Sequence, residues 1–320
     1  MRFIKQIPRL LVAITFLFSG FVKLVDPLGT SYKLTEYFTE DVLDLPFLIP
    51  YALPIAIFLI LFEIVLGVML LVGYLPKVTT WSLVGIMLLF LFLTWYSAYF
   101  DKVTDCGCFG DALKMSPWKT FYKNAVLFLL VIYLVFQIKN IHPFININVT
   151  KWVVFISFTI FLYIIYYVFM HLPLIDFRPY AVGKNLPEQM QFKGQELPPV
   201  HDFYFENTEG VDFTNAILKG NKVLLIVMYD LDKSDKDGLV GLNDVISSAS
   251  QNSYMVYALT SSAAEAFENI KAKYNLNIVS LFGDEITLKT IIRANPGIVI
   301  LKNGTVTGKW NWTDIEKINF

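Results

Sequence analysis

Five long apolar stretches dominate the first 172 residues of this chain of 320. A helix that crosses the hydrocarbon core of a bilayer needs about 20 mostly apolar residues, and each stretch meets that length. Because the bilayer core offers no hydrogen-bond partner to the backbone, such stretches must fold as helices. The sequence therefore predicts a mainly α membrane helix bundle of about five transmembrane helices, at residues 8–26, 50–73, 78–100, 119–138 and 151–172.

The composition supports residence in a membrane and excludes nucleic-acid binding. Hydrophobic residues make up 55% of the chain and charged residues only 17%, which is too apolar for a fully soluble protein. A net charge of -1 leaves no surplus of cations to neutralise a phosphate backbone. The lipid bilayer is therefore an expected partner, and nucleic acid is not.

Lysine and arginine residues near the ends of the stretches indicate an orientation. Arg2, Lys5 and Arg9 precede or open the first stretch, and Lys77 and Lys139 follow at stretch ends on the same side. Cationic residues collect on the cytoplasmic side, so we expect a multi-pass protein with a cytoplasmic N-terminus. An odd number of spans then carries the C-terminal part to the periplasmic side.

Two cysteines, Cys106 and Cys108, lie in one loop between the third and fourth stretches, and the chain has no others. Gly107 between them has no Cβ, so the two thiols can meet, and a bridge across so small a ring is strained and easily reduced. The sequence predicts a candidate redox pair at the boundary between the membrane and water, on the outer side. Alternatively, the two cysteines form a structural disulfide or remain as two reduced thiols.

A metal site at this loop would need at least one ligand besides two thiolates. Among the three histidines, His171 and His201 fall on the outer side and His142 does not. No ligand spacing connects either outer histidine with the cysteines. We therefore expect no metal site.

Polar residues within the apolar stretches form a second candidate site. Glu63 is a carboxylate deep within a span, where an unpaired charge is costly. The rise of a helix, counted from the outer span ends, places Glu63 about 18 Å deep and Lys23 about 5 Å deep. We therefore expect Ser19 or Thr15, and not Lys23, to be the hydrogen-bond partner of Glu63. A proton or quinol site and interhelical packing are both open interpretations.

A proline-rich connector separates the last apolar stretch from a soluble part with alternating strand and helix patterns. The expected domains are a four-helix transmembrane bundle at 1–140, a fifth transmembrane helix at 141–178, a connector at 179–200 and an outer domain at 201–320.

The order of strands, hairpin and terminal helix in the last part resembles the α/β thioredoxin fold. In that fold a proline, usually cis, precedes the hairpin, and Pro296 occupies the matching place. Asp232 and Asp235 stand where thioredoxins carry Cys-x-x-Cys. Carboxylates cannot exchange disulfides. The resemblance therefore implies a thioredoxin-like domain with a degenerate site, used for docking and not for catalysis.

The first four helices resemble the DoxX and MauE families of bacterial membrane proteins. The resemblance rests on residues 18–27, on Glu63 with 66–67, and on 106–110, while residues 176–180 look like a longer, Bacteroidetes-type form. It implies a bacterial inner-membrane protein with a redox-associated role. MauE-like proteins are linked to methylamine utilisation, where they are thought to help a periplasmic partner form its disulfides.

A helix bundle joined to a thioredoxin-like domain also looks like bacterial vitamin-K-epoxide-reductase homologues, which pass electrons from a thiol partner to quinone. A single cysteine pair cannot form such a relay alone, so an external partner is needed. Two functions stay open. One is a thiol–disulfide oxidoreductase that assists a periplasmic protein through Cys106 and Cys108, with quinone as a candidate cofactor. The other is a non-enzymatic membrane scaffold or assembly subunit. The sequence names neither the client nor the electron acceptor.

Overall fold

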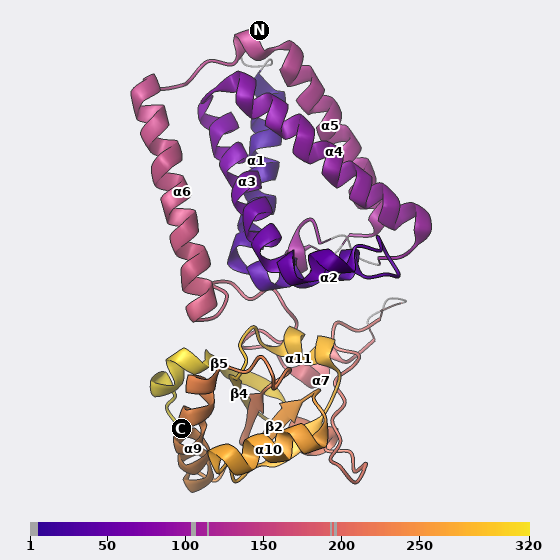
Figure 1. Ribbon diagram of the computed structural model, residues 1–320, viewed down its shortest axis with the longest axis vertical. Helices are drawn as coiled ribbons and strands as arrows, with labels where there is room; N and C mark the ends of the chain where they lie inside the picture. The colour runs from indigo at the N-terminus through magenta and orange to yellow at the C-terminus, as the bar shows by residue number, and fades with distance from the viewer. Residues whose placement is uncertain (1–5, 104–106, 114, 193, 195–196) are drawn as a thin grey trace. The chain divides into compact units, whose positions relative to one another are not determined.

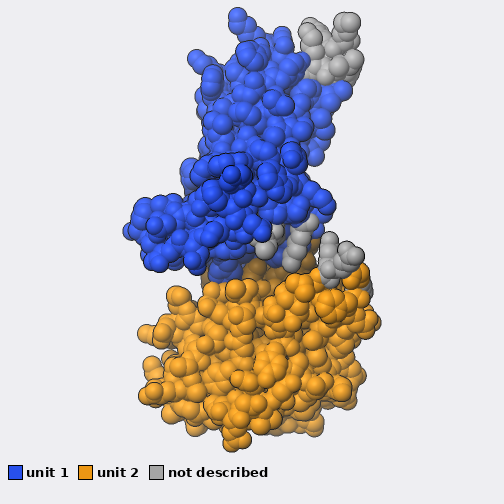
Figure 2. Space-filling view, turned by 90° about the vertical axis from the view of Figure 1, so that its right-hand side faces the viewer, with its two compact units in different colours: residues 1–168 blue, residues 169–320 orange. Residues whose placement is uncertain are grey.

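The structure is a computed structural model that describes residues 6–103, 107–113, 115–192, 194 and 197–320. The chain divides into two compact units, Met1–Val168 and Phe169–Phe320, coloured separately in Figure 2. Five helices in the described part are long and apolar enough to cross a membrane, and the second unit contains a mixed sheet with helices. The predicted fold class, a membrane helix bundle followed by an α/β domain, is confirmed.

The five candidate spans agree with the predicted stretches to within about one helical turn. Proline stands in the first turn of several of them, where its missing N–H is not needed. Gly73 ends the second span in the left-handed conformation, with a φ of 76°. The spans are α1 (Ile7–Val25), α3 (Ala52–Val72), α4 (Pro76–Phe100), α5 (Pro117–Phe136) and α6 (Ile147–Met170) (Figure 1).

An additional helix, α2 (Pro27–Phe38), occupies a segment that was expected to be a loop. The Asp26 side chain caps it by accepting a hydrogen bond from the Gly29 N–H at 3.0 Å, and Pro27 occupies the first turn. The short helix η2 (Pro46–Tyr51) then leads into α3. The Tyr37 hydroxyl lies 2.8 Å from the Ser97 hydroxyl of α4, within a cluster of buried apolar side chains. This segment is therefore a folded cover on α3 and α4.

Two glycines bring α1 and α3 together. A Cβ added at Gly20 would lie 2.7 Å from the Cβ of Ile64, and one at Gly67 would lie 3.0 Å from the Cγ of Leu17. Small residues allow close approach where lipid supplies no hydrophobic force between helices. The two contacts also fix an antiparallel register, in which each step forward along α1 matches one step back along α3.

Arg9 closes the opposite end of the same helix pair. Its guanidinium donates to the carbonyl oxygens of Leu70 at 2.8 Å, Leu71 at 3.0 Å and His142 at 3.1 Å. Leu70 and Leu71 lie in the last turn of α3, where carbonyls lack partners within the helix. The Arg9 side chain is thus buried without leaving its charge unsatisfied.

The α/β unit is built on a five-stranded sheet in the order β3-β2-β1-β4-β5. The first three strands run parallel, and β4 and β5 form an antiparallel hairpin beside β1. Buried apolar residues cover both faces of the sheet. The elements are α7 (Leu186–Gln189), α8 (Thr214–Lys219), β1 (Val223–Val227), α9 (Lys236–Gln251), β2 (Met255–Thr260), α10 (Ala264–Tyr274), β3 (Val279–Phe282), α11 (Glu285–Ile291), β4 (Gly297–Lys302), β5 (Thr305–Asn311) and η5 (Trp312–Lys317).

The last turn of α6 is completed by side chains from the end of the sheet. The Asn311 amide donates to the carbonyl oxygen of His171 at 2.6 Å, and the Thr313 hydroxyl donates to that of Met170. The His171 Nδ1 lies 2.8 Å from a carboxylate oxygen of Asp314. These side chains supply the partners that the last carbonyls of a helix lack.

Ion pairs fasten the connector to β5. Asp176 accepts hydrogen bonds from Arg178 Nε at 2.7 Å and from Lys309 Nζ at 2.6 Å. Burial opposes the charge on Asp176, but the two cations outweigh it and lower its pKa to about 2. Burial and the nearby Arg178 charge lower the pKa of Lys309 to about 7, because Asp176 offsets them only in part. Lys309 therefore holds its proton weakly in the folded unit.

We predict that the free energy of unfolding of the α/β unit rises between pH 7 and about pH 10. Lysine in an unfolded chain titrates near pH 10.4, so the unfolded state binds more protons than the folded state in this window. Hydrogen exchange of β4 and β5 in the full chain, corrected for intrinsic rates, measures the rise. Lys309→Met should flatten it, whereas Lys302→Met at an exposed position of β4 should not. A wild-type stability that falls across this window would contradict the prediction.

A second prediction concerns the contact between α1 and α3. Gly20→Ala should destabilise the protein by about 1–3 kcal/mol, because its Cβ overlaps Ile64. Gly85→Ala is the matched control on α4, where an added Cβ meets nothing within 4 Å. It should be neutral or stabilise by up to about 1 kcal/mol. Thermal unfolding of the detergent-solubilised chain compares the two. Equal unfolding temperatures for the two variants would show that α1 and α3 are not in close contact at Gly20.

Candidate functional site

The polar residues predicted within the spans meet in the interior of the bundle. Lys23 Nζ lies 2.7 Å from Glu63 Oε2 and donates to the Ser19 hydroxyl at 3.1 Å. The side chains of Lys23 and Glu63 are only 9% and 3% exposed. The ammonium also lies 5.0 Å from the centre of the Phe90 ring on α4. The centre of this site is thus a buried, hydrogen-bonded ion pair that joins α1 to α3.

The expectation that Lys23 lies too far from Glu63 was wrong. It assumed that α1 and α3 end at the same depth. The register fixed by Gly20 and Gly67 instead places Lys23 level with Leu61, two residues or about 3 Å from Glu63 along the axis. By the same register, α3 extends seven residues, or about 10 Å, beyond the end of α1. The expected partner Thr15 donates to the Leu11 carbonyl within its own helix.

The loop that carries Cys108 is held against this cluster. The Ser19 hydroxyl donates to the carbonyl oxygen of Cys108 at 2.7 Å, so Ser19 contacts both the loop and Lys23. The Phe109 ring lies 5.4 Å from the Phe18 ring and 4.0 Å from Lys123 Nζ. Cys106 lies outside the described residues, so its pairing with Cys108 stays a prediction.

Cys108 and the ion pair line one recess between α1, α3, α4 and α5. Its enclosed volume is about 20 Å³, roughly enough for one water molecule. The recess combines a thiol residue, a buried cation and mostly apolar walls. Its lining residues are Thr15, Phe16, Ser19, Lys23, Glu63, Met87, Phe90, Cys108, Lys123, Asn124 and Leu127.

Two lining residues on α5, Lys123 and Asn124, were not singled out from the sequence. The signal was present, because polar residues inside an apolar span point toward other helices and not toward lipid. The Asn124 amide lies 3.5 Å from the Thr94 hydroxyl, so it also contacts α4.

The described part of the chain contains no cluster of three or more His, Cys, Asp or Glu residues that could hold a metal ion. His171 contacts Asp314, and His201 Nε2 lies 3.0 Å from a carboxylate oxygen of Asp202. Each of the two outer histidines therefore has a carboxylate partner within the α/β unit.

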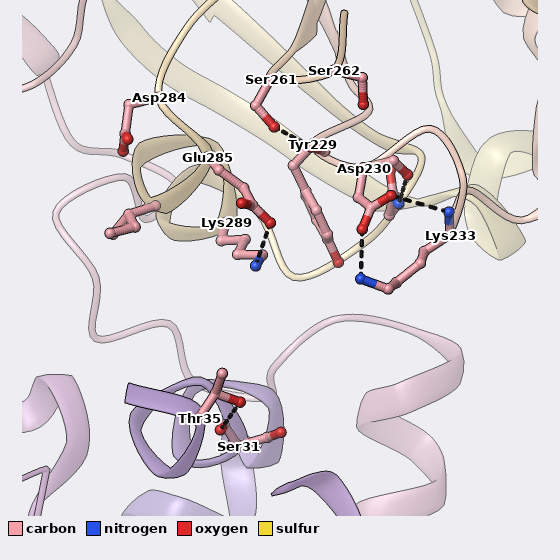
Figure 3. Close-up of polar contacts among 12 residues, drawn as sticks. Ser31, Thr35, Tyr229, Asp230, Lys233, Ser261, Ser262, Asp284, Glu285 and Lys289 are labelled. Atoms are coloured by element: carbon pink, nitrogen blue, oxygen red, sulfur yellow. Dashed lines mark hydrogen bonds and ion pairs between the residues drawn. The ribbon is translucent and has the colours of Figure 1, made fainter. Parts of the chain in front are cut away.

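In the α/β unit, Asp232 and Asp235 lie in the loop between β1 and α9. Asp235 caps α9, since its carboxylate accepts hydrogen bonds from the N–H groups of Asp237 at 3.0 Å and Gly238 at 3.4 Å. Asp232 is exposed. Figure 3 shows the adjacent ion pair of Asp230 and Lys233, 2.7 Å long. The two aspartates thus have different surroundings, and Asp235 has a structural role.

The loop before β4 faces these aspartates. The peptide bond between Asn295 and Pro296 is cis. The side-chain amide of Asn295 donates to the backbone carbonyl of Asp230 at 2.6 Å. The backbone carbonyl oxygen of Asn295 accepts a hydrogen bond from the Asp235 N–H at 3.0 Å. Its side-chain oxygen accepts a hydrogen bond from the Ser234 hydroxyl at 3.0 Å. The loop after β1 and the loop before β4 therefore hold each other in place.

Comparison with known protein families bears on the bundle. Residues 1–137 match the family of methylamine utilisation protein MauE. The match spans α1 to α5 and includes the cysteine loop, so this part of the chain is similar to that family. No curated protein matches the chain. The MauE part of the predicted resemblance and a membrane-associated role are therefore supported.

We predict that neither Asp232 nor Asp235 takes part in chemistry. Asp235→Ala should destabilise the α/β unit by about 1 kcal/mol through loss of the helix cap. Asp232→Ala should change stability by less than about 0.5 kcal/mol, because the side chain is exposed. Neither change should affect the predicted redox exchange of Cys106 and Cys108. Loss of that exchange in a folded Asp232→Ala variant would contradict the prediction.

Proposed function

We propose that this membrane protein exchanges disulfides with an external protein through Cys106 and Cys108. The observation that carries the proposal is that Cys108 lines a recess together with a buried lysine. A cation near a cysteine increases its thiolate fraction, and the thiolate is the species that attacks a disulfide. The chain has no third cysteine, so the second thiol couple must come from another molecule.

The exchange is balanced in two steps. A thiolate of the partner attacks one sulfur of the Cys106–Cys108 disulfide, forms a mixed disulfide and displaces the other cysteine as a thiolate. The partner's second thiolate then attacks the mixed disulfide, which closes the partner disulfide and releases the remaining cysteine. Two electrons and two protons pass from the partner to the pair. A quinone of the bilayer, itself reduced to the quinol, would accept them and restore the disulfide.

We further propose that the α/β unit is a thioredoxin-like docking domain on the periplasmic side of a bacterial inner membrane, with the N-terminus in the cytoplasm. The strand order and the position of Pro296 directly before β4 support the fold assignment. The helix-capping role of Asp235 and the exposure of Asp232 support docking over catalysis. The lysine and arginine distribution supports the orientation. The predicted resemblance of the first four helices to the DoxX family is also part of this proposal.

The test is to trap the exchange partner in cells. Cys106→Ser leaves Cys108 without its neighbour, so we expect a mixed disulfide with a periplasmic protein to accumulate after acid quenching and alkylation. It should appear as a larger species that a reductant abolishes. The double serine variant is the control and should show neither that species nor activity.

Two results would contradict this proposal. A double serine variant with full function, or a wild-type pair that stays reduced in an oxidising periplasm, would remove the redox assignment. The protein would then be a non-enzymatic membrane scaffold or assembly subunit.

A further inference from the structure

Residues 171–177, which follow α6, carry an apolar outer surface. The side chains that the segment exposes are Leu174 (52% exposed), Ile175 (44%) and Phe177 (40%). The segment also contains two titratable side chains, His171 and Asp176, and both are paired with charged side chains of the α/β unit. The outward surface of the segment is therefore apolar and shows no unpaired charge.

The segment is held against β5 at two points. At its start, the Asn311 amide donates to the carbonyl oxygen of His171 at 2.6 Å. Near its end, Lys309 Nζ donates to a carboxylate oxygen of Asp176 at 2.6 Å. Lys309 and Asn311 are two residues apart on one strand, a separation of about 7 Å. The exposed side chains therefore lie on a short loop with both ends fixed.

The length of α6 places the start of this loop at the membrane boundary. Lys151 is the charged residue of the helix, and its ammonium needs water or lipid headgroups. From Lys151 to Met170 the helix rises by about 29 Å, close to the thickness of about 30 Å of a typical hydrocarbon core. Met170 therefore lies where the hydrocarbon ends, and Ile175 follows five residues later.

We propose that the loop of residues 171–177 is a membrane anchor, in which Leu174, Ile175 and Phe177 enter the boundary between the headgroups and the acyl chains of the bilayer. Lipid is the partner because the loop begins where α6 leaves the hydrocarbon and its outward side chains are apolar. Single exposed apolar residues are ordinary on a protein surface, but three within four positions, with the charge between them turned inward, form a patch. The anchor does not depend on disulfide exchange.

The anchor orients the sheet, because helix α6 and the loop are both attached to the same end of β5. That end, at Asn311, then faces the membrane. Pairing across the sheet places Met255 of β2 level with Val306 of β5. Val306 is five residues from Asn311, or about 17 Å along the strand. Met255 is 38% exposed and is therefore a matched apolar position at the opposite end of the sheet.

The experiment measures the depth of a spin label in the bilayer. With Cys106→Ser and Cys108→Ser the chain has no cysteine, so a nitroxide attached after Ile175→Cys or Met255→Cys reports on one position. The full chain is placed in phosphatidylcholine nanodiscs. Power saturation then compares the collisions of the label with oxygen, which concentrates in lipid, and with a nickel chelate, which stays in water. We expect the label at position 175 to lie about 5–10 Å into the boundary between headgroups and acyl chains, and the label at position 255 to lie in water.

A matched pair of charge substitutions tests whether the apolar side chains cause this depth. With the label attached after Phe177→Cys, Ile175→Asp should shift the label toward water, because a carboxylate opposes insertion into lipid. Met255→Asp should leave its depth unchanged. Hydrogen exchange of β4 and β5 verifies that the sheet is folded in each variant.

Three results would overturn the inference. The first is a label at position 175 that meets the nickel chelate as often as the label at position 255 does. The second is a low collision rate with both reagents, because protein and not lipid would then cover the loop. The third is a label at position 177 whose depth is insensitive to Ile175→Asp in a folded chain, because α6 alone would then set that depth. If Ile175→Asp unfolds the sheet, the comparison of positions 175 and 255 decides.

Discussion

The ion pair between Lys23 and Glu63 is the interaction on which the interior of the bundle depends. Within hydrocarbon, a charged side chain needs a partner, and removing one member of a buried pair costs about 3–5 kcal/mol. The two side chains meet because α1 and α3 hold one register, and Gly20 and Gly67 permit it. The same register leaves the N-terminal part of α3 without α1 beside it, and α2 covers that part. The ion pair, the glycines and the cover are thus consequences of one packing arrangement.

The spans could be predicted because hydrocarbon thickness fixes the length of an apolar helix, whatever its neighbours are. The helix α2 could not be found by the same count, because its residues are of mixed polarity. The first stretch was predicted to end at Asp26, although an aspartate followed by proline is also a common helix start. The position of Lys23 relative to Glu63 depends on how two helices slide along each other. That is a property of packing, which no count along one helix supplies.

The candidate site shows the same division. Ser19, Lys23 and Glu63 were identified individually because polar residues are rare within spans. The contact between Ser19 and Cys108 was not identified, because the two residues are 89 positions apart and only the fold brings them together. In the α/β unit, a hairpin after Pro296 was predicted, and the structure places its turn at Asn303 and Gly304. The edge strand β3 has only four residues, which are too few to establish an alternating pattern in the sequence.

The side chains that complete α6 have a consequence for how the protein is made. Asn311 and Thr313 supply hydrogen bonds to carbonyls of a helix that ends at Met170. The ribosome synthesises these residues about 140 positions after the helix itself, so the helix end must rely on water until they have been made. A product that terminates before β5 would keep every membrane span and still display open carbonyls at that end. A chain without these residues would thereby differ from the full one in the hydrogen bonding at the end of α6.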